Sequence, residues 1–185
     1  MNPTKRHPLF IITGASCVGK STLCDLLFQK ETDYIVLESD ILWHDVYNTP
    51  EDDYRAYRKT WQRLCANISQ IGKPVVLCGC ATPEQFESLP ERALFTKIHY
   101  LAVVCDDLVL ENRMRNGRGI SDENWIASSK QFNNWLKENG KSHGIFLLDN
   151  SGLTIKESAE IADKWILDTI ENGRESMDRW FQPKI

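Results

Sequence analysis

Residues 14–21 read Gly-Ala-Ser-Cys-Val-Gly-Lys-Ser, which fits the pattern G-x-x-x-x-G-K-[ST]. The apolar run 9–13 precedes this stretch and a segment with Leu23, Leu26 and Leu27 follows it, so the motif stands between an expected strand and an expected helix. Glycines let such a loop wrap its backbone N–H groups around phosphate, and the positive end of the next helix faces the anion. The stretch therefore predicts a loop that binds nucleotide phosphates.

The side chains of this loop have expected roles. Lys20 reaches the β- and γ-phosphates of ATP, Ser21 places its hydroxyl on Mg²⁺, and Thr22 meets the α-phosphate. Cys17 stands next to the helix N-terminus, where a thiolate is favoured, so we expect it to react with thiol reagents. The expected nucleotide site comprises Gly14, Ala15, Ser16, Cys17, Val18, Gly19, Lys20, Ser21 and Thr22.

Composition indicates one globular domain over residues 1–185. The chain is 42% hydrophobic and 26% charged, and its length suffices for a core without a disulfide or metal. With 22 basic and 26 acidic residues the net charge is −4, and no polybasic run is present, which disfavours nucleic acid as a partner. No apolar stretch is long enough for a membrane span and no signal peptide is recognisable, so we expect a cytoplasmic protein.

Short β-rich runs alternate with helical patterns along the chain. Near-continuous Ile, Val and Leu in these runs is typical of parallel strands covered by helices on both faces, which predicts an α/β fold with three layers. The expected strands are residues 9–13, 34–37, 74–78, 98–105 and 144–148.

Capping residues and apolar periodicity predict the helices. Pro50 opens a helix that Gly72 stops, with an apolar stripe that includes Trp61. Ser121 caps a helix that runs to Gly140 and carries Trp125, Phe132 and Trp135 toward the core. Capping boxes start two further helices at Thr82 and Thr154, the second of which ends near Gly173. Trp180 and Phe181, beyond it, dock on the body or on a second subunit, which leaves a homodimer open.

The six cysteines form neither a C-x-x-C pair nor a zinc-finger spacing with histidine, which disfavours a metal site. Cys78 and Cys105 end apolar runs, and Cys65 lies on an apolar helical stripe. We therefore expect buried, reduced thiols.

Asp40 follows the second expected strand, at the carboxyl end of the sheet and on the γ-phosphate side of the loop. A carboxylate there can receive the proton of an acceptor hydroxyl, and it can also hold Mg²⁺. The alternative is an aspartate that only caps a helix or faces solvent.

A cationic segment at about residues 113–123 predicts a lid over the phosphates. Asn116, Gly117, Arg118 and Gly119 place an arginine between two glycines, after a helix that carries Arg113 and Arg115. Guanidinium groups suit a transferring phosphoryl group, so Arg113 and Arg118 are candidate catalytic residues and Arg115 a candidate nucleotide ligand.

This order of parts resembles the small P-loop metabolite kinases of the nucleoside monophosphate kinase group, and especially their gluconate-kinase-like and shikimate-kinase-like branch. The resemblance rests on residues 14–22, on Ser39 to His44, on Val75 to Cys80 and on Leu110 to Arg118. It implies a strand order of 2-3-1-4-5, ATP across residues 14–22 and beneath the lid, and Asp40 facing the acceptor. It also implies that the loop 149–152 borders the adenine.

Two features depart from that pattern. The third expected strand ends Leu-Cys-Gly-Cys at residues 77–80, so the Walker B acid that would hold Mg²⁺ is missing there. Neither a gluconate-binding pattern after the second strand nor the Asp-Gly-x-Pro-Arg signature of nucleotide kinases is present. The acceptor therefore stays open.

The segment from about residue 40 to 72 is expected to recognise the acceptor. An aromatic ring and a guanidinium can stack on a base or hold an acidic sugar, so nucleosides, nucleotides and sugar acids such as gluconate all remain. Trp61 is favoured as a core residue, and His44 and Arg58 are balanced between surface and pocket. The residues considered are Trp43, His44, Arg55, Arg58, Trp61 and Arg63.

The chain is thus expected to be a small-molecule kinase that uses ATP and Mg²⁺. The alternative is a regulatory switch or binding module driven by ATP or GTP, but the base-specifying motif Asn-Lys-x-Asp of GTPase-like switches is absent. A third hypothesis, phosphorylation of nucleic-acid ends or of an antibiotic, requires a basic channel or a hydrophobic acceptor cleft.

Overall fold

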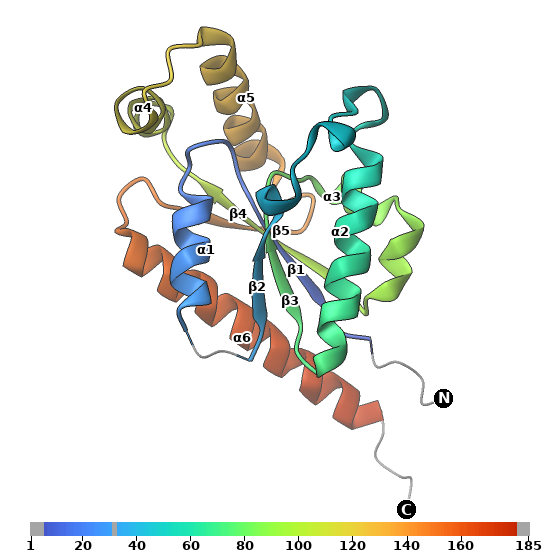
Figure 1. Cartoon of the computed structure of the whole chain (residues 1–185). Coiled ribbons are helices and arrows are strands. Elements are labelled where there is room, and N and C mark those ends of the chain that lie inside the picture. The colour runs from blue at the N-terminus through green and yellow to red at the C-terminus, as the bar shows by residue number, and fades with distance from the viewer. Residues whose placement is uncertain (1–5, 31–32, 181–185) are drawn as a thin grey trace, which may run out of the picture.

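A five-stranded parallel sheet forms the centre of the computed structural model, which describes residues 6–30 and 33–180 (Figure 1). The strand order β2-β3-β1-β4-β5 confirms the expected order, and every strand end lies within one residue of its expected position. The strands are β1 Leu9–Thr13, β2 Ile35–Glu38, β3 Val75–Cys78, β4 Ile98–Val104 and β5 Ile145–Asp149.

Helices connect consecutive strands and cover both faces of the sheet. The α-helices are α1 Lys20–Phe28, α2 Arg55–Ile68, α3 Pro83–Glu87, α4 Asp107–Asn112, α5 Glu123–Asn139 and α6 Ile155–Trp180. Short 3-10 turns occupy Ser39–Leu42, Asp45–Tyr47, Pro50–Asp52, Ser69–Ile71 and Pro90–Leu94, and a π-helical turn occupies Arg113–Gly117.

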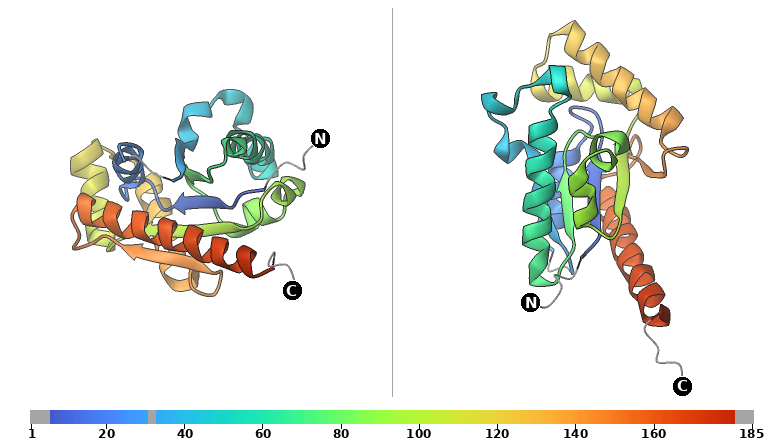
Figure 2. Two further views of the ribbon diagram at one scale, coloured as in Figure 1. Left: turned by 90° about the horizontal axis from the view of Figure 1, so that it is seen from below. Right: turned by 90° about the vertical axis from the view of Figure 1, so that its right-hand side faces the viewer.

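Alternate residues of the strands pack against different helices. Phe10 and Ile12 of β1 belong to the core on the α1 and α6 side, which includes Leu23 and Ile166. The strand neighbours Leu9 and Ile11 belong to the opposite core, which contains residues of α2 and α3. Figure 2 shows α6 along one face of the sheet and α2 along the other. All five residues of β1 are buried, as expected for a central parallel strand.

Three helix boundaries differ from those expected. The chain bends at Asp53 and Tyr54, which both have φ of 56°, so α2 begins at Arg55 instead of Pro50. Asp122 caps α5 in place of Ser121, because its side chain accepts from the backbone N–H groups of Asn124 and Trp125. Helix α6 continues past Gly173 to Trp180, whereas Phe181 lies outside the described residues.

Two further expectations about the core were wrong. Trp125 is 48% exposed, because α5 buries the neighbouring Ile126 instead. Cys78 is not a reduced thiol: it forms a disulfide with Cys24, with the two Cα atoms 6.6 Å apart. This bond joins α1 to the end of β3. Cys65 and Cys105 are buried free thiols, as expected, and burial raises the pKa of Cys65 to about 12.

The helices were also compared with the length and hydropathy that a bilayer requires. Within residues 6–30 and 33–180, no helix is both long and apolar enough to cross one.

Candidate active site

The phosphate-binding loop lies between β1 and α1, as the motif predicts. Gly14 has φ of +152°, and a Cβ atom there would lie 2.5 Å from the backbone oxygen of Val103, so only glycine fits. Gly19 has φ of +111° at the start of α1. The Lys20 amino group donates to the backbone oxygens of Gly14 and Ala15, each at 2.8 Å, and so lies across the loop.

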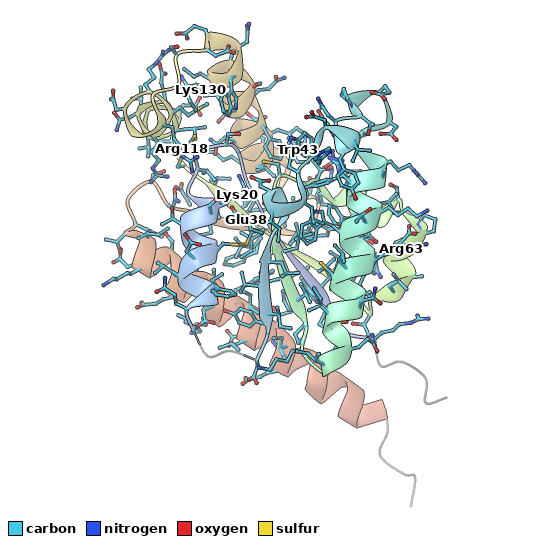
Figure 3. The ribbon with its side chains drawn as sticks, viewed as in Figure 1. Lys20, Glu38, Trp43, Arg63, Arg118 and Lys130 are labelled. Carbon is cyan, nitrogen blue, oxygen red and sulfur yellow. A yellow bond between two sulfur atoms is a disulfide. The ribbon has the colours of Figure 1, made fainter. Side chains whose placement is uncertain are left out.

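A cavity of about 340 Å³, here called the nucleotide cavity, opens beside this loop. Residues of the loop line this cavity together with two arginines of the predicted lid and residues that follow β5. Figure 3 labels two of the lining residues, Lys20 and Arg118. The lining residues are Cys17, Val18, Gly19, Lys20, Ser21, Thr22, Arg113, Gly117, Arg118, Asn150, Leu153, Ile155 and Ser158. Gly14, Ala15 and Ser16 shape the loop but do not line the cavity in the described structure.

Arg113 is fixed in the nucleotide cavity. Its guanidinium donates to the backbone oxygen of Val18 and to Oδ1 of Asn150, both at 2.9 Å. The Asn150 amide in turn donates to Val18 at 2.9 Å. Asn150 therefore links the lid to the phosphate-binding loop and lines the nucleotide cavity, whereas the expectation that loop 149–152 borders the adenine stays a prediction.

The other two arginines of the lid differ from one another. Arg115 forms ion pairs of 2.8 Å with Glu111 and with Glu123, and the structure does not bring it to the nucleotide cavity. Arg118 lines the cavity, and it forms no ion pair within the described part of the chain. Opposite charges nearby in sequence, at positions 111 and 123, were the signal that Arg115 would be occupied.

The end of β3 explains why no acidic residue stands there. Cys78 is bonded to Cys24, and a Cβ atom on Gly79 would lie 2.2 Å from the hydroxyl of Ser39. A side chain at position 79 would therefore displace the segment that carries Asp40.

Glu38 is an acidic residue near the phosphate-binding loop that the sequence analysis did not consider, although it does not line the nucleotide cavity. It pairs in register with Cys78, and it shares a face of β2 with Val36, which belongs to the core beneath α1. Two links relate Glu38 to the start of α1: its register partner Cys78 is bonded to Cys24, and Cys24 stands one helical turn after Ser21. Glu38 is half-buried, on the α1 side of the sheet, two residues before Asp40. An acid at the carboxyl end of an apolar strand was the available signal.

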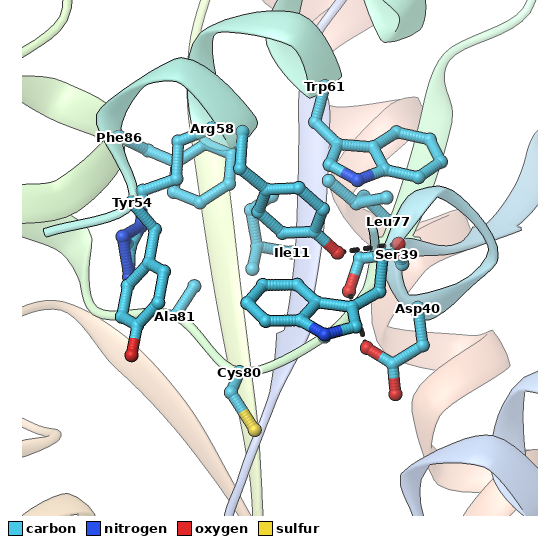
Figure 4. Close-up of a pocket in the computed structure, with 13 residues that line it drawn as sticks. Ile11, Ser39, Asp40, Tyr54, Arg58, Trp61, Leu77, Cys80, Ala81 and Phe86 are labelled. Atoms are coloured by element: carbon cyan, nitrogen blue, oxygen red, sulfur yellow. Dashed lines mark hydrogen bonds between the residues drawn. The ribbon is translucent and has the colours of Figure 1, made fainter. Parts of the chain in front are cut away.

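A second cavity, of about 270 Å³, lies beyond the ends of β1 and β3 and is called here the acceptor pocket (Figure 4). Asp40 lines it, and its side chain accepts from the Ser39 hydroxyl at 3.3 Å, whereas its expected place opposite an acceptor stays a prediction. The lining residues are Ile11, Ser39, Asp40, Trp43, Tyr54, Tyr57, Arg58, Trp61, Leu77, Gly79, Cys80, Ala81 and Phe86.

Aromatic rings set at steep angles form much of the wall of this pocket. The Trp43 ring lies 5.4 Å from that of Tyr57 at 82°, and Tyr57 lies 6.5 Å from Trp61 at 85°. The Tyr57 hydroxyl donates to the backbone oxygen of Ser39 at 2.5 Å, and burial raises its pKa, so it stays protonated. This bond fixes α2 against the segment that carries Asp40.

Arg58 is 8% exposed and lines the same pocket. Its guanidinium donates to the backbone oxygen of Asp53, lies 3.6 Å from the Asp53 carboxylate, and stands 5.6 Å above the centre of the Tyr54 ring. Burial lowers the pKa of Arg58 without removing its charge. Its Nε atom is buried and has no partner in the described structure.

The remaining candidates of segment 40–72 have other roles. Trp61 is 2% exposed, which confirms it as a core residue, although one edge reaches the acceptor pocket. His44 is exposed and caps a 3-10 turn by accepting from Val46. Arg63 pairs with Glu91 at 3.1 Å, away from both cavities.

One contact joins the acceptor pocket to the phosphate-binding loop. The thiol of Cys80, in the acceptor pocket, donates to the backbone oxygen of Gly14, in the phosphate-binding loop, at 3.3 Å. The pocket that contains Asp40 is therefore in direct contact with the loop that precedes Lys20.

Comparisons of fold find kinases, although no protein-family profile and no curated protein sequence matches the chain. A gluconokinase from Sinorhizobium meliloti has a TM-score of 0.68 at 17% identity, over 93% of this chain and 99% of that one. A sugar kinase from a Janibacter species has 0.66 at 16%, over 88% and 95%. A shikimate kinase from Acinetobacter baumannii has 0.56 at 12%, over 90% and 96%. The chain has the P-loop kinase fold.

Proposed function

We propose that this protein transfers the γ-phosphoryl group of ATP to a hydroxyl group of a small molecule held in the acceptor pocket. The observation that carries the proposal is the contact between Cys80 and Gly14, which joins a pocket containing Asp40 to the phosphate-binding loop. A nucleotide-driven switch would not need a second pocket against the phosphate-binding loop. The single domain is expected to use residues 40–72 for the acceptor and residues 113–123 as a lid.

The nucleotide cavity fits the triphosphate of ATP. Gly14 and Gly19 give the loop the backbone conformation that phosphate oxygens require, and the start of α1 directs N–H groups toward them. Lys20 would exchange its bonds to the loop carbonyls for the β- and γ-phosphates. Arg113 and Arg118 would offset the charge that develops on the transferred group, while Arg115 would support the lid through its ion pairs.

The acidic and hydroxyl groups near the loop suit Mg²⁺, which prefers oxygen ligands and retains several waters. When bound, the ion neutralises charge on the β- and γ-phosphates. We propose that Ser21 holds the ion with support from Glu38 or Asp40. The described residues contain no cluster of three metal-binding side chains that would hold the ion without the nucleotide. Glu38 would then supply the acid that the end of β3 lacks.

Asp40 would act as the general base. As phosphoryl transfer proceeds, the acceptor O–H bond breaks and its proton passes to the Asp40 carboxylate. The acceptor oxygen forms a bond to the γ-phosphorus while the bond from that phosphorus to the β-γ bridging oxygen breaks. ADP leaves, and the acceptor becomes a phosphate ester.

The proposed location is the cytoplasm, where ATP is supplied. A disulfide is rare in that compartment, so Cys24 and Cys78 would there be reduced in part of the molecules. Association into a homodimer stays open.

An ADP-release assay tests the proposed activity. The purified chain with MgATP is offered nucleosides, nucleotides, sugar acids and aminoglycosides, and the Lys20→Ala variant supplies the blank. We expect one class to raise ADP release well above the rate with water alone. A chain that binds MgATP in calorimetry but responds to no acceptor would contradict the proposal.

A further inference from the structure

The acceptor pocket has a chemical character that narrows the substrate. Of the 13 described residues that line it, five are aromatic and two are charged, Asp40 and Arg58. Trp43 lines the pocket and is 48% exposed overall, so its neighbours do not cover it fully. Polar recognition of a sugar acid calls for several hydrogen-bonding groups, whereas eight of these 13 residues are aromatic or aliphatic (Figure 4).

The charges of the pocket disfavour an anionic acceptor. Arg58 is the one cation among the described lining residues, and the carboxylate and backbone oxygen of Asp53 already engage it. Gln85 donates to the same Asp53 carboxylate at 3.0 Å, which holds that partner in place. A carboxylate or phosphate prefers both edges of a free guanidinium. Asp40 adds a negative charge that would repel such a group.

Arg58 nevertheless has one unpartnered donor, and because neighbouring atoms cover it, a ligand would reach it only after a shift of the Arg58 side chain. Its Nε atom is buried and unpartnered in the described structure, on a side chain that is more than nine-tenths buried beside Tyr54. A buried donor without a partner is costly, and a ligand that accepts from it would remove that cost. A single neutral acceptor atom, such as a ring nitrogen or a carbonyl oxygen, matches one N–H group.

We propose that the acceptor is an uncharged alcohol with a planar ring. The ring would stack on Trp43 within the aromatic wall, a neutral oxygen or nitrogen would accept from Nε of Arg58, and the hydroxyl would face Asp40. A cavity of about 270 Å³ holds one such small molecule. Nucleosides and aryl alcohols share this chemistry. The inference rests on the proposed function for the transfer of the phosphoryl group to the hydroxyl, but binding of the ring does not require turnover.

The first test measures binding without nucleotide. Calorimetry compares nucleosides and sugar-free aryl alcohols with gluconate, shikimate and nucleoside monophosphates, at equal concentrations. We expect binding from at least one of the two neutral planar classes, at least about tenfold tighter than from any anion, and the two arms identify which class supplies the ring. Tighter binding of an anionic or purely aliphatic compound would overturn the inference while leaving the proposed kinase activity intact.

The second test uses Trp43 and a matched control. Trp43→Ala should weaken binding of the planar alcohol by about 5- to 100-fold, the worth of one stacked ring, and Trp43→Phe should restore most of it. Trp125→Ala is the control, because Trp125 is also 48% exposed and lines neither cavity. Equal effects of Trp43→Ala and Trp125→Ala would overturn stacking.

A variant of Arg58 tests the unused donor. Arg58→Lys keeps the charge near Asp53 but removes the Nε–H group, so the planar alcohol should lose affinity by about tenfold. The same loss for an analogue without the accepting atom would contradict the assigned contact. If the planar alcohol binds as expected and ADP release stays at the rate with water, then the proposed function fails and the binding inference survives.

Discussion

The nucleotide cavity and the acceptor pocket are built from different materials. The first combines the backbone of one short stretch, residues 14–22, in which Gly14 and Gly19 have positive φ, with side chains from the lid and from the segment after β5. The second gathers side chains from β1, the turn after β2, α2, the end of β3 and α3. A phosphate-binding loop can serve many different reactions, because its backbone N–H groups bind phosphate whatever the acceptor is. An acceptor pocket is specific to one protein, because the shapes and charges of its side chains determine which molecule it binds.

This difference predicts how substitutions should behave. Changes in the nucleotide cavity should impair transfer to every acceptor, and changes in the acceptor pocket should depend on the acceptor offered. The variants below compare the two regions.

Lys20→Ala should have the largest effect. It removes the cation that offsets the β- and γ-phosphates and leaves a residue compatible with the helix start. We expect turnover to fall by about 10³–10⁵, the worth of a charge that stabilises a transferring phosphoryl group, and calorimetry to show much weaker MgATP binding. Lys164→Ala, on the exposed side of α6, is the control. Wild-type MgATP affinity and turnover in Lys20→Ala would refute the phosphate-binding loop.

Asp40→Asn should come next. The change keeps the shape of the side chain and removes the proton-accepting charge, so turnover with the true acceptor should drop by about 10²–10⁴ while MgATP affinity changes little. Steady-state kinetics and calorimetry measure the two quantities separately. Asp45→Asn, exposed in the same segment, controls for the loss of one surface charge.

Asp40→Asn also separates three roles. An aspartate that only caps a turn tolerates asparagine, so undiminished turnover would exclude the general base. Loss of MgATP affinity along with turnover would move Asp40 to metal binding. In that case Glu38→Gln should spare MgATP affinity.

The lid arginines allow a narrower comparison. Arg113→Ala should lower turnover by about 10², the usual cost of one donor to a charged transition state. Arg115→Ala should lower it about twofold, because its ion pairs with Glu111 and Glu123 occupy the guanidinium. Equal losses measured by steady-state kinetics would mean that Arg115 leaves those pairs to reach the nucleotide.

The disulfide should affect stability more than chemistry. Cys24 and Cys78 close a loop with a sequence separation of 54, so the double variant Cys24→Ala/Cys78→Ala should lose about 2–4 kcal/mol of unfolding free energy. That loss corresponds to a Tm lower by about 5–15 °C in calorimetry. Cys65→Ala, which breaks no bond, controls for the lost thiol volume. If a strong reductant leaves the Tm of the wild type unchanged, then the bond is not formed in solution.

The sequence predicted the sheet and the phosphate-binding loop well because both depend on local patterns. Runs of Ile, Val and Leu identified each strand, and the spacing of Gly14, Gly19 and Lys20 identified the loop. The position of Asp40 at the carboxyl edge of the sheet was predictable because Asp40 directly follows β2, and parallel strands share one carboxyl edge. These inferences needed no knowledge of distant contacts.

Long-range contacts account for the expectations that failed. The Cys24–Cys78 bond joins residues whose distance no local pattern reveals. The bend at Asp53 and Tyr54 places two non-glycine residues at φ of 56°, at a cost of about 1–3 kcal/mol each, and the contacts of Arg58 and Gln85 with Asp53 hold it. Helical periodicity alone therefore began α2 too early.

The contact between Gly79 and Ser39 carries an evolutionary consequence. A Cβ atom on residue 79 would lie 2.9 Å from the Ser39 Cβ as well as 2.2 Å from its hydroxyl, and both atoms belong to the Ser39 side chain. Descendants of this chain could regain a Walker B carboxylate at position 79 only if residue 39 lost its side chain or the turn 39–42 moved first. Among homologues, residues 39 and 79 should therefore change together. Where residue 79 is an acid, residue 38 should no longer be Glu, because the acid at 79 would take over the metal-binding role proposed for Glu38.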